Sequence, residues 1–288
     1  MAKNYWHLDG YNSPYAFSDQ LKRASTNKAF SKRYQLASTL TDASFFGTST
    51  MQEADDLLQN GYADGLKDML EDKGGVPFDS TRSYIERRTD FVGQRPHIVN
   101  AIVGRPKTMV HRIKQEREQK TITLYYNVGV GESVANSQII RAGKNFLALC
   151  QYLERHSYRV RIEMAAAACT RGDDRTDSIF LHIKCKDYSQ PLNPLMLAYP
   201  LVHPAFFRRH IFRYIEVAKN TDSEAWTFGY GSAYFDSQRI IDAFRDKKQD
   251  AVRYGISKDG YLFNNADLVH ANTIDDLLKI MDKQKIFK

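Results

Sequence analysis

Apolar residues follow helical spacing in the segment 47–75. Ser49 or Thr50 can cap the first helix of this segment, and Glu53 is placed to complete a capping box. Gly61 is typical of a residue that ends a helix. The apolar residues beyond it predict a second short helix. We therefore expect a helical hairpin here.

The preceding residues, 1–44, are polar and rich in Ser, Thr, Lys and Tyr. A helix capped by Ser18 fits part of this segment, but its apolar face is thin. We interpret the segment as an arm that packs on another element or on another subunit.

The segment 92–113 has Gly, Pro and Arg at nearly regular intervals. Pro96 and Pro106 forbid one continuous helix, although a short helix from Pro96 to Val103 is compatible with proline at a first helical position. A charged stretch follows, which suits a linker or a helix end. We place a domain boundary near residue 118, so that residues 1–118 form a smaller, mainly helical N-terminal region.

Strands and helices alternate after residue 118. This alternation predicts an α/β domain over residues 119–288, with a mostly parallel, Rossmann-like sheet flanked by helices on both faces. No helix separates the second and third strands, so we expect one antiparallel strand at the sheet edge. We expect Pro200 and Pro204 to break the helix that contains them. The expected strands are 121–130, 158–169, 177–187, 225–231 and 251–257, and the expected helices are 133–156, 193–219, 236–249 and 273–284.

The turn after the first expected strand is where many α/β proteins bind a phosphate or a metal ion. It does not match the dinucleotide fingerprint, because Val134 stands where the third glycine belongs, and it lacks the Gly-Lys-Ser/Thr of a P-loop. In the metal-ion-dependent adhesion site of von Willebrand factor A domains, the aligned positions are Asn127, Gly129 and Gly131. An amide and two glycines are poor ligands for a hard cation. We predict no metal and no other cofactor, and we interpret Ser133 as a helix N-cap.

Three segments resemble a known family: FFGTSTMQEADDLLQNGYADGLKDM, LYYNVGVGESVANSQIIRAGKNFLAL and AYPLVHPAFFRRHIFRYIE. They are similar to uncharacterised proteins of tailed bacteriophages and prophages, which carry GT-x-T-x-x-EA, YN-x-S-x-S-x-GVSA and A-x-P-x-V/A-HP-x-x-x-RR. The similarity covers most of the chain from about residue 45 to 230. Gly129 and Gly131 depart from it, because serines are common there. The resemblance implies a phage setting and a von Willebrand A-like domain, and it carries over no activity.

Basic residues are concentrated in one window. The formal net charge is +7, and residues 81–120 contain ten Lys or Arg and four Asp or Glu. Such a window is typical of a surface that binds nucleic acid or an acidic protein face, and also of a solvated surface without a partner. The candidate contact residues are Arg87, Arg88, Arg95, Arg105, Lys107, Arg112 and Lys114.

A second basic group lies in the stretch HPAFFRRHIFRY. Arg208, Arg209 and Arg213 alternate with aromatic residues, a pattern that suits contacts to a nucleic-acid backbone and stacking on bases. The alternative is a core helix whose aromatic residues pack on the sheet, while the arginines face water or pair with carboxylates. We interpret His203 as a structural residue at a kink.

Three widely spaced cysteines, Cys150, Cys169 and Cys185, form no CxxC pair, and this argues against a zinc site or a disulfide framework. The chain shows no signal-peptide run and no stretch of about 18 consecutive apolar residues. We expect a protein of the bacterial host cytoplasm or of the virion, without a membrane partner.

These observations favour a non-enzymatic, phage-encoded binding protein that acts on nucleic acid or on a phage or host protein through its basic surface. One alternative is a virion component of the head, connector or tail. Another is an enzyme with its site at the strand ends near Asn127. No residue is proposed as catalytic, because no nucleophile or acid–base motif is present. A homo-oligomer is compatible with the polar arm.

Overall fold

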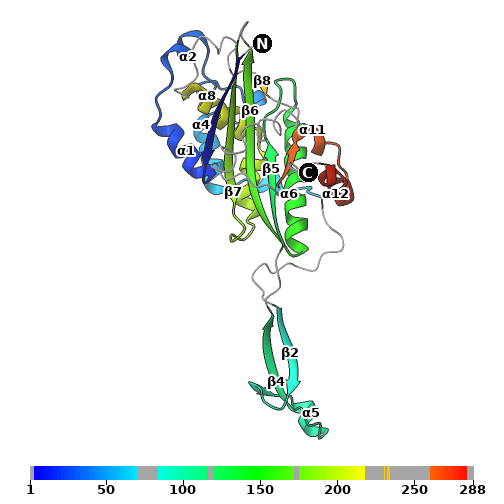
Figure 1. Ribbon diagram of the computed structural model, residues 1–288. Helices are drawn as coiled ribbons and strands as arrows, with labels where there is room; N and C mark the ends of the chain where they lie inside the picture. The colour runs from blue at the N-terminus through cyan, green and yellow to red at the C-terminus, as the bar shows by residue number, and fades with distance from the viewer. Residues whose placement is uncertain are drawn as a thin grey trace. The chain divides into compact units, whose positions relative to one another are not determined.

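The computed structural model describes residues 3–70, 84–115, 120–171, 175–217, 230, 232–233 and 260–283. The chain divides into two compact units (Figure 1): a main unit of Met1–Gly74 with Thr121–Lys288, and a hairpin unit of Gly75–Lys120. This division differs from the predicted one. The residues before 75 belong to the same unit as the α/β domain, and only the predicted boundary near 118 lies close to a boundary between units.

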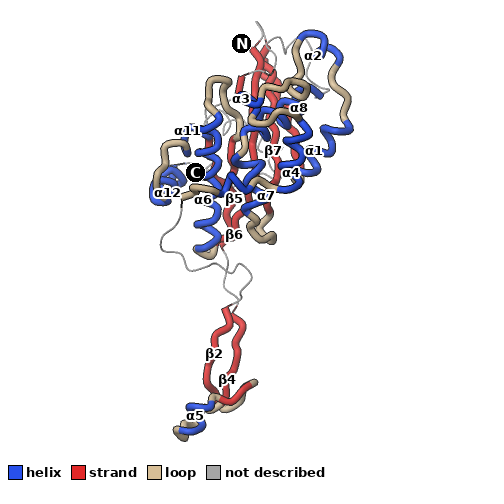
Figure 2. The backbone as a smooth tube through the Cα atoms, turned by 180° about the vertical axis from the view of Figure 1, so that it is seen from behind, coloured by secondary structure: helices blue, strands red, loops and turns tan. Residues whose placement is uncertain are grey.

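The main unit is built on a sheet with the strand order β1-β7-β6-β5-β9. β1 pairs in parallel with β7, β5 pairs in parallel with β9, and β6 runs antiparallel to β7. The predicted α/β fold with a mostly parallel sheet flanked by helices is confirmed, although the longer helices among the described residues lie in one layer rather than on both faces (Figure 2). The strands are β1 (Lys3–Tyr11), β5 (Lys120–Asn127), β6 (Tyr158–Arg171), β7 (Arg175–Lys186) and β9 (Gly260–Asn264), and the two-residue β8 (Ser232–Ala233) pairs with β6.

The sheet contains one strand that was not expected, and one prediction about it is wrong. Part of the expected N-terminal arm is the strand β1, which pairs with β7 over its whole length. Because β1 lies outside β7, the antiparallel pair of β6 and β7 lies within the sheet rather than at its edge. The expected elements at 225–231, 236–249 and 251–257 fall outside the described residues, apart from Tyr230.

The longer helices of the main unit form one layer over the sheet (Figure 2). Within it α1 packs on α4, α4 on α7, and α7 on α6, while α11 and α12 pack on α6. Among the described residues, none of the helices has the length and apolar character that crossing a membrane requires. The helices are α1 (Pro14–Arg23), α2 (Lys28–Arg33), α3 (Ala43–Phe46), α4 (Met51–Asn60), α6 (Asn136–Arg155), α7 (Pro194–Val202), α8 (Phe212–Val217), α11 (Asn265–Leu268) and α12 (Ile274–Lys283), with the 3₁₀ turn η1 (Ala63–Leu66) and the π-helical η2 (Phe206–Ile211).

The cap predicted for α4 is confirmed. The N–H of Glu53 donates to Oγ1 of Thr50 at 3.1 Å, and the N–H of Ser49 donates to the Glu53 carboxylate at 2.7 Å. Gly61 ends the helix with a φ of 83°. The second helix of the expected hairpin is only the turn η1 as far as the structure describes it.

Other predicted helix ends are wrong. Ser13, not Ser18, caps α1, and Ala135, not Ser133, is the N-cap residue of α6. Pro200 lies inside α7 without ending it, so the helix stops only at His203, before Pro204.

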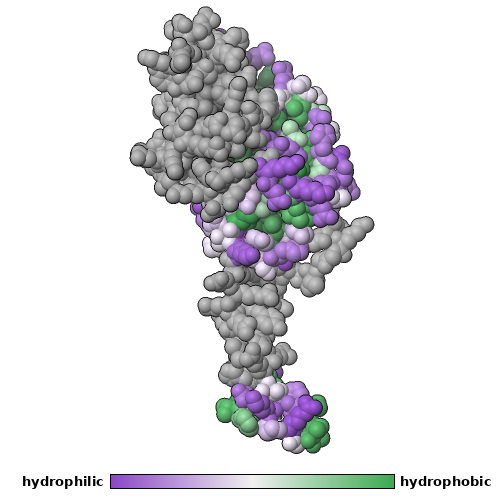
Figure 3. Space-filling model, turned by 45° about the vertical axis from the view of Figure 1, so that its right-hand side comes forward, coloured by the Kyte–Doolittle hydropathy of each residue, from purple (hydrophilic) through white to green (hydrophobic). Residues whose placement is uncertain are grey.

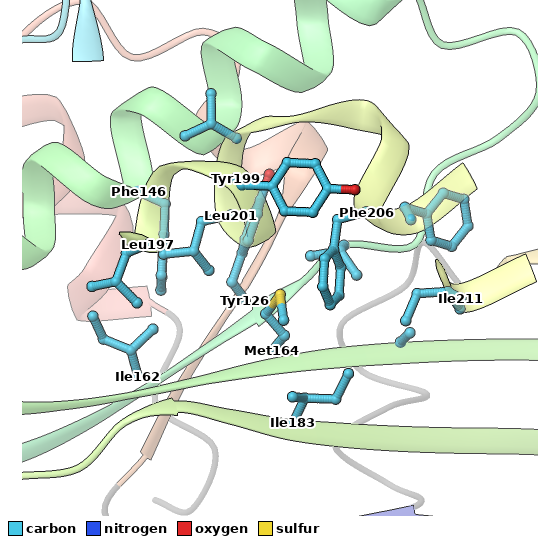
Figure 4. Close-up of a cluster of buried hydrophobic side chains, with 14 of the residues drawn as sticks. Tyr126, Phe146, Ile162, Met164, Ile183, Leu197, Tyr199, Leu201, Phe206 and Ile211 are labelled. Carbon is cyan, nitrogen blue, oxygen red and sulfur yellow. The ribbon is translucent and has the colours of Figure 1, made fainter. Parts of the chain in front are cut away.

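The core lies between the helical layer and the sheet (Figure 4). Phe146 of α6 stacks on Tyr126 of β5, with ring centroids 4.8 Å apart. Leu201 of α7 and Phe206 of η2 cover Met164 of β6. This interface buries the apolar face of α6, which includes Ile139, Phe146 and Leu153.

The hairpin unit has its own small sheet. β2 (Tyr84–Asp90) pairs antiparallel with β4 (Met109–Gln115), and β3 (Arg95–Pro96) also pairs with β4. The helix predicted from Pro96 to Val103 is present but shorter, as α5 (Ile98–Ile102). It starts later because Pro96 belongs to β3 and His97 caps the helix. The stretch expected to be a linker or a helix end is strand as far as Gln115.

Candidate functional site

Asn127 at the carboxyl end of β5 is a bridge between two strands. Its side chain is fully buried, and its Nδ2 donates to Oδ1 of Asn264 in β9 at 3.0 Å. Its Oδ1 accepts the N–H of Gly129 at 3.0 Å. These two hydrogen bonds give the buried amide a partner for its nitrogen and a partner for its oxygen. The second bond also fixes the turn that follows β5. Gly131 follows in the same turn and is partly exposed.

A pocket of about 240 Å³ lies beside this turn, between Gly129 and the start of α11. Two amides line it. Asn264 Nδ2 donates to Asp267 at 3.2 Å, and Asn265 Nδ2 donates to the Tyr126 hydroxyl at 3.3 Å. Within the described residues, no group of three or more His, Cys, Asp or Glu is placed to hold a metal ion. The chemistry available here is hydrogen bonding to a small polar molecule.

Arg208 and Arg209 are buried, contrary to the prediction that they contact nucleic acid. Arg209 donates to the carbonyls of Ala37 and Leu40, both at 2.7 Å, and to the carbonyl of Thr48 at 2.6 Å. Its guanidinium also lies 4.3 Å from the ring centroid of Phe46. Burial lowers the pKa of both arginines from its usual value.

Arg208 also donates its hydrogen bonds to groups within the main unit. It donates to the carbonyls of Phe45 and Val134 and to Oδ1 of Asn136, each at 2.7 Å. Arg213 donates to Oγ1 of Thr26 at 2.6 Å and pairs with a neighbouring glutamate. These three arginines therefore tie the N-terminal residues to the α/β domain, and their donors face inward.

The sequence predicts Asp55 as a carboxylate on a helix surface, but in the structure Asp55 belongs to a buried polar network. His210 Nε2 lies 3.1 Å from Oδ1 of Asp55, and its Nδ1 lies 3.2 Å from the Tyr199 hydroxyl. Ser18 donates to the same carboxylate at 2.9 Å. Burial alone would raise the pKa of Asp55, but the contacts with His210, Ser18 and Lys22 lower it overall. The network has a structural role, because it joins α1, α4 and η2.

His203 also has the structural role that the sequence predicts. Its Nδ1 accepts the N–H of Ala205 at 3.2 Å, just where α7 ends. Burial lowers the pKa of this imidazole to about 4.

At the end of the hairpin unit, large apolar side chains are exposed and a polar side chain is buried. We call residues 91–108, between β2 and β4, the tip. Asn100 is buried in it and donates to the carbonyl of Lys107 at 3.0 Å. Of the eight large apolar side chains exposed in the described part of the chain, six lie in the tip: Phe91, Val92, Ile98, Val99, Ile102 and Val103. Sequence patterns could not show this, because apolar periodicity predicts a face but not what covers it.

The predicted basic residues of the 81–120 window divide into two sets. Arg95, Arg105 and Lys107 belong to the tip and are exposed. Lys107 Nζ lies 3.9 Å from Asp90 and 5.7 Å from the centroid of the Phe91 ring. The remaining four lie on the paired strands β2 and β4, with side chains outside the described part: Arg87, Arg88, Arg112 and Lys114.

Residues 6–286 match a family model described as a domain of unknown function, DUF7192. The chain belongs to the DUF7192 family. No curated protein and no solved structure matches the chain. The family match spans both units, so the hairpin unit with its tip lies inside the DUF7192 domain.

Proposed function

We propose that this protein is a non-enzymatic binding protein whose contact surface is the tip of the hairpin unit. The observation that carries the proposal is the cluster of six exposed large apolar side chains around a buried amide. Burying one such side chain is worth about 1.5 to 3 kcal/mol. Exposed apolar side chains gathered in one small region are more typical of an interaction site than the same side chains scattered singly over a surface. A partner that covers the tip would recover this energy.

The positive charge in and next to the tip indicates what kind of partner the surface would bind. Residues 91–115 contain five Lys or Arg and neither Asp nor Glu. Exposed Arg95, Arg105 and Lys107 are therefore suited to an anionic partner.

A von Willebrand A-like fold for the main unit forms part of the same proposal. Reading β5 as the first strand, the order β7-β6-β5-β9 runs third, second, first, fourth, which is the order of the first four strands of a doubly wound sheet, here with an antiparallel pair of β6 and β7. The degenerate turn at Asn127 supports a binding role rather than an enzymatic one, because its amide is engaged in strand-to-strand contacts.

Photo-crosslinking tests the proposal on the full chain in bacterial cells. A benzophenone amino acid replaces Phe91 in the tip, and in a matched control it replaces Tyr15, an exposed aromatic residue of the main unit. Benzophenone reacts with C–H groups of proteins, lipids and nucleic acids alike. We expect adducts at position 91 to exceed those at position 15 by about tenfold, in line with a buried contact. Equal yields at the two positions would refute the proposal.

Nucleic acid is a second candidate partner, favoured by the basic count of the window. Its contacts would come from the hairpin unit alone, since Arg208 and Arg209 are buried. A gel-shift assay at low salt tests it. Neutralising Arg95, Arg105 and Lys107 together should reduce the slope of log K against log salt by about 3. Retarded bands that do not change in the triple variant would exclude these three residues as the contacts.

The phage setting implied by the resemblance gives a further proposal, that the protein is a virion component. The tip then serves as a contact to a neighbouring subunit. Mass spectrometry of purified particles tests this version, and absence of the chain from particles would eliminate it.

A further inference from the structure

We propose that the tip docks on an anionic lipid bilayer, with its apolar side chains at the headgroup boundary and its basic residues beside the lipid phosphates. The inference rests on the proposed function and names the partner of the same surface. It also revises the expectation of no membrane partner, which considered only spanning segments.

The first argument is the kind of side chain that is exposed. Ile98 and Ile102 are one helical turn apart in α5, Val99 and the C-cap residue Val103 have the same spacing, and Phe91 directly follows β2. Ile, Val and Phe partition favourably into the hydrocarbon region of a bilayer. The tip contains neither Trp nor Tyr, so apart from Phe91 its exposed large apolar side chains are the aliphatic chains of Ile and Val.

The second argument is the backbone of the tip, because unpaired N–H groups oppose entry into lipid. His97 N–H donates to the Thr108 carbonyl at 2.6 Å, and Asn100 N–H donates to Nδ1 of His97 at 3.2 Å. Arg105 N–H donates to the Asn100 carbonyl at 2.9 Å. Pro96 and Pro106 carry no N–H. Much of the polar backbone of the tip is thus satisfied within the tip itself.

The third argument is the charge beside the apolar side chains. Figure 3 shows hydrophobic surface on two sides of the tip, with hydrophilic surface between them. Asp90, the residue directly before the tip in the sequence, is paired with Lys107. Basic residues next to an exposed apolar cluster are suited to anionic headgroups, which attract Lys and Arg at the surface of a bilayer. An acidic, apolar protein groove would satisfy the same charges, and the test separates the two.

Vesicle flotation with the full chain tests the inference. Vesicles of phosphatidylcholine alone are compared with vesicles that also contain about 30% phosphatidylglycerol. We expect the apparent affinity for the anionic vesicles to be about tenfold higher or more, and to fall as salt is added.

Two variants separate the apolar contribution to vesicle binding from the charged one. Ile98→Ser/Ile102→Ser removes apolar surface and should lower the bound fraction about tenfold. Arg105→Gln/Lys107→Gln should markedly reduce the preference for anionic vesicles, with exposed Arg95 left in place. Matched controls lie in the main unit, where Tyr15→Ser removes an exposed aromatic side chain and Lys279→Gln/Lys283→Gln removes two exposed charges. Neither control should change binding.

Binding to neither kind of vesicle would overturn the inference, as would binding that both tip variants retain. Analytical ultracentrifugation supplies a further outcome. Self-association that is lost in Ile98→Ser/Ile102→Ser would identify a second copy of the chain as the occupant, and would also overturn it. Protein adducts at position 91 without vesicle binding would refute the membrane while leaving the tip as the contact surface. Equal crosslinking at positions 91 and 15 would instead refute the proposed function itself.

Discussion

Arg209 of the main unit and Ile102 of the tip lie in the opposite of the environments that their side chains usually occupy. Arg209 is fully buried, whereas Ile102 is 79% exposed. The arginine is compensated from within the chain, because the carbonyls of Ala37, Leu40 and Thr48 accept its hydrogen bonds. The isoleucine has no such compensation in the tip, where the buried residue is the amide Asn100.

This difference separates the region that stabilises the fold from the region that is available to bind a partner. A buried charge persists only where its donors are satisfied, so the arginines of η2 hold the fold together. Exposed aliphatic side chains contribute little to folding of the isolated chain, so a role for them requires something outside it. The comparison can be tested by making the same change in each region.

The largest effect is expected from Arg209→Met compared with Arg105→Met. The first variant leaves three carbonyls without their donor, and each unpaired buried group costs about 1 to 3 kcal/mol. We expect the free energy of unfolding to fall by about 3 to 5 kcal/mol, as measured by urea denaturation. Arg105 is exposed, so its variant should change that energy by less than about 0.5 kcal/mol. Similar losses in both variants would contradict the assigned difference in burial.

A smaller effect should follow from the titration of His203, a partly buried imidazole in the main unit. The folded protein lowers the pKa of His203 from 6.5 to about 4. Between these values the unfolded chain binds a proton that the folded chain does not, so stability is lost as pH falls from 6.5 to 4. We expect that loss to be about 1 to 3 kcal/mol.

His203→Asn should remove the loss, since the asparagine keeps an acceptor for the Ala205 N–H but does not titrate. Unfolding free energies measured at several pH values between 4 and 7 check this. The control is His270→Asn, at an exposed position, which should leave the wild-type slope unchanged. A slope that persists in His203→Asn would assign the acid sensitivity to another group.

Much of the main-unit fold could be predicted from local patterns. β5, α6 and α12 each carry their own periodicity, so single-sequence reasoning found them. β1 could not be found in this way, because its polar and apolar residues do not alternate regularly and its partner β7 lies more than 160 residues away. Pro200 misled the prediction of α7, because the surrounding packing outweighs the local cost of a proline.

The candidate site was predicted only in part. The basic character of the hairpin unit is visible in composition, and three of its predicted residues are exposed in the tip. The burial of Arg208 and Arg209 could not be predicted, because the Arg209 acceptors lie 161 to 172 positions earlier in the chain. The exposure of the apolar side chains in the tip could not be predicted either, since apolar spacing is the same in a buried helix and in an exposed one.

Asn100→Ala tests the interior of the tip with a smaller expected effect. The change removes the donor to the Lys107 carbonyl and should destabilise the tip by about 1 to 2 kcal/mol. Hydrogen exchange at the amides of Gly104 and Arg105 reports this local opening. Gln94→Ala, at an exposed position of the same tip, should leave their exchange rates unchanged. Equal acceleration in both variants would show that the amide does not organise the tip.

The smallest effect is expected from Ile102→Ser, and it separates contact from stability most directly. Ile102 is largely exposed, so replacing it with serine should change the free energy of unfolding by less than about 0.5 kcal/mol. The same change at buried Ile211 of η2 should cost about 3 kcal/mol or more, because it removes packed methyl groups and buries a hydroxyl. Urea denaturation of both variants measures the difference. A large loss of stability in Ile102→Ser would show that the tip is covered by the chain itself, and the exposed surface on which the binding role depends would not exist.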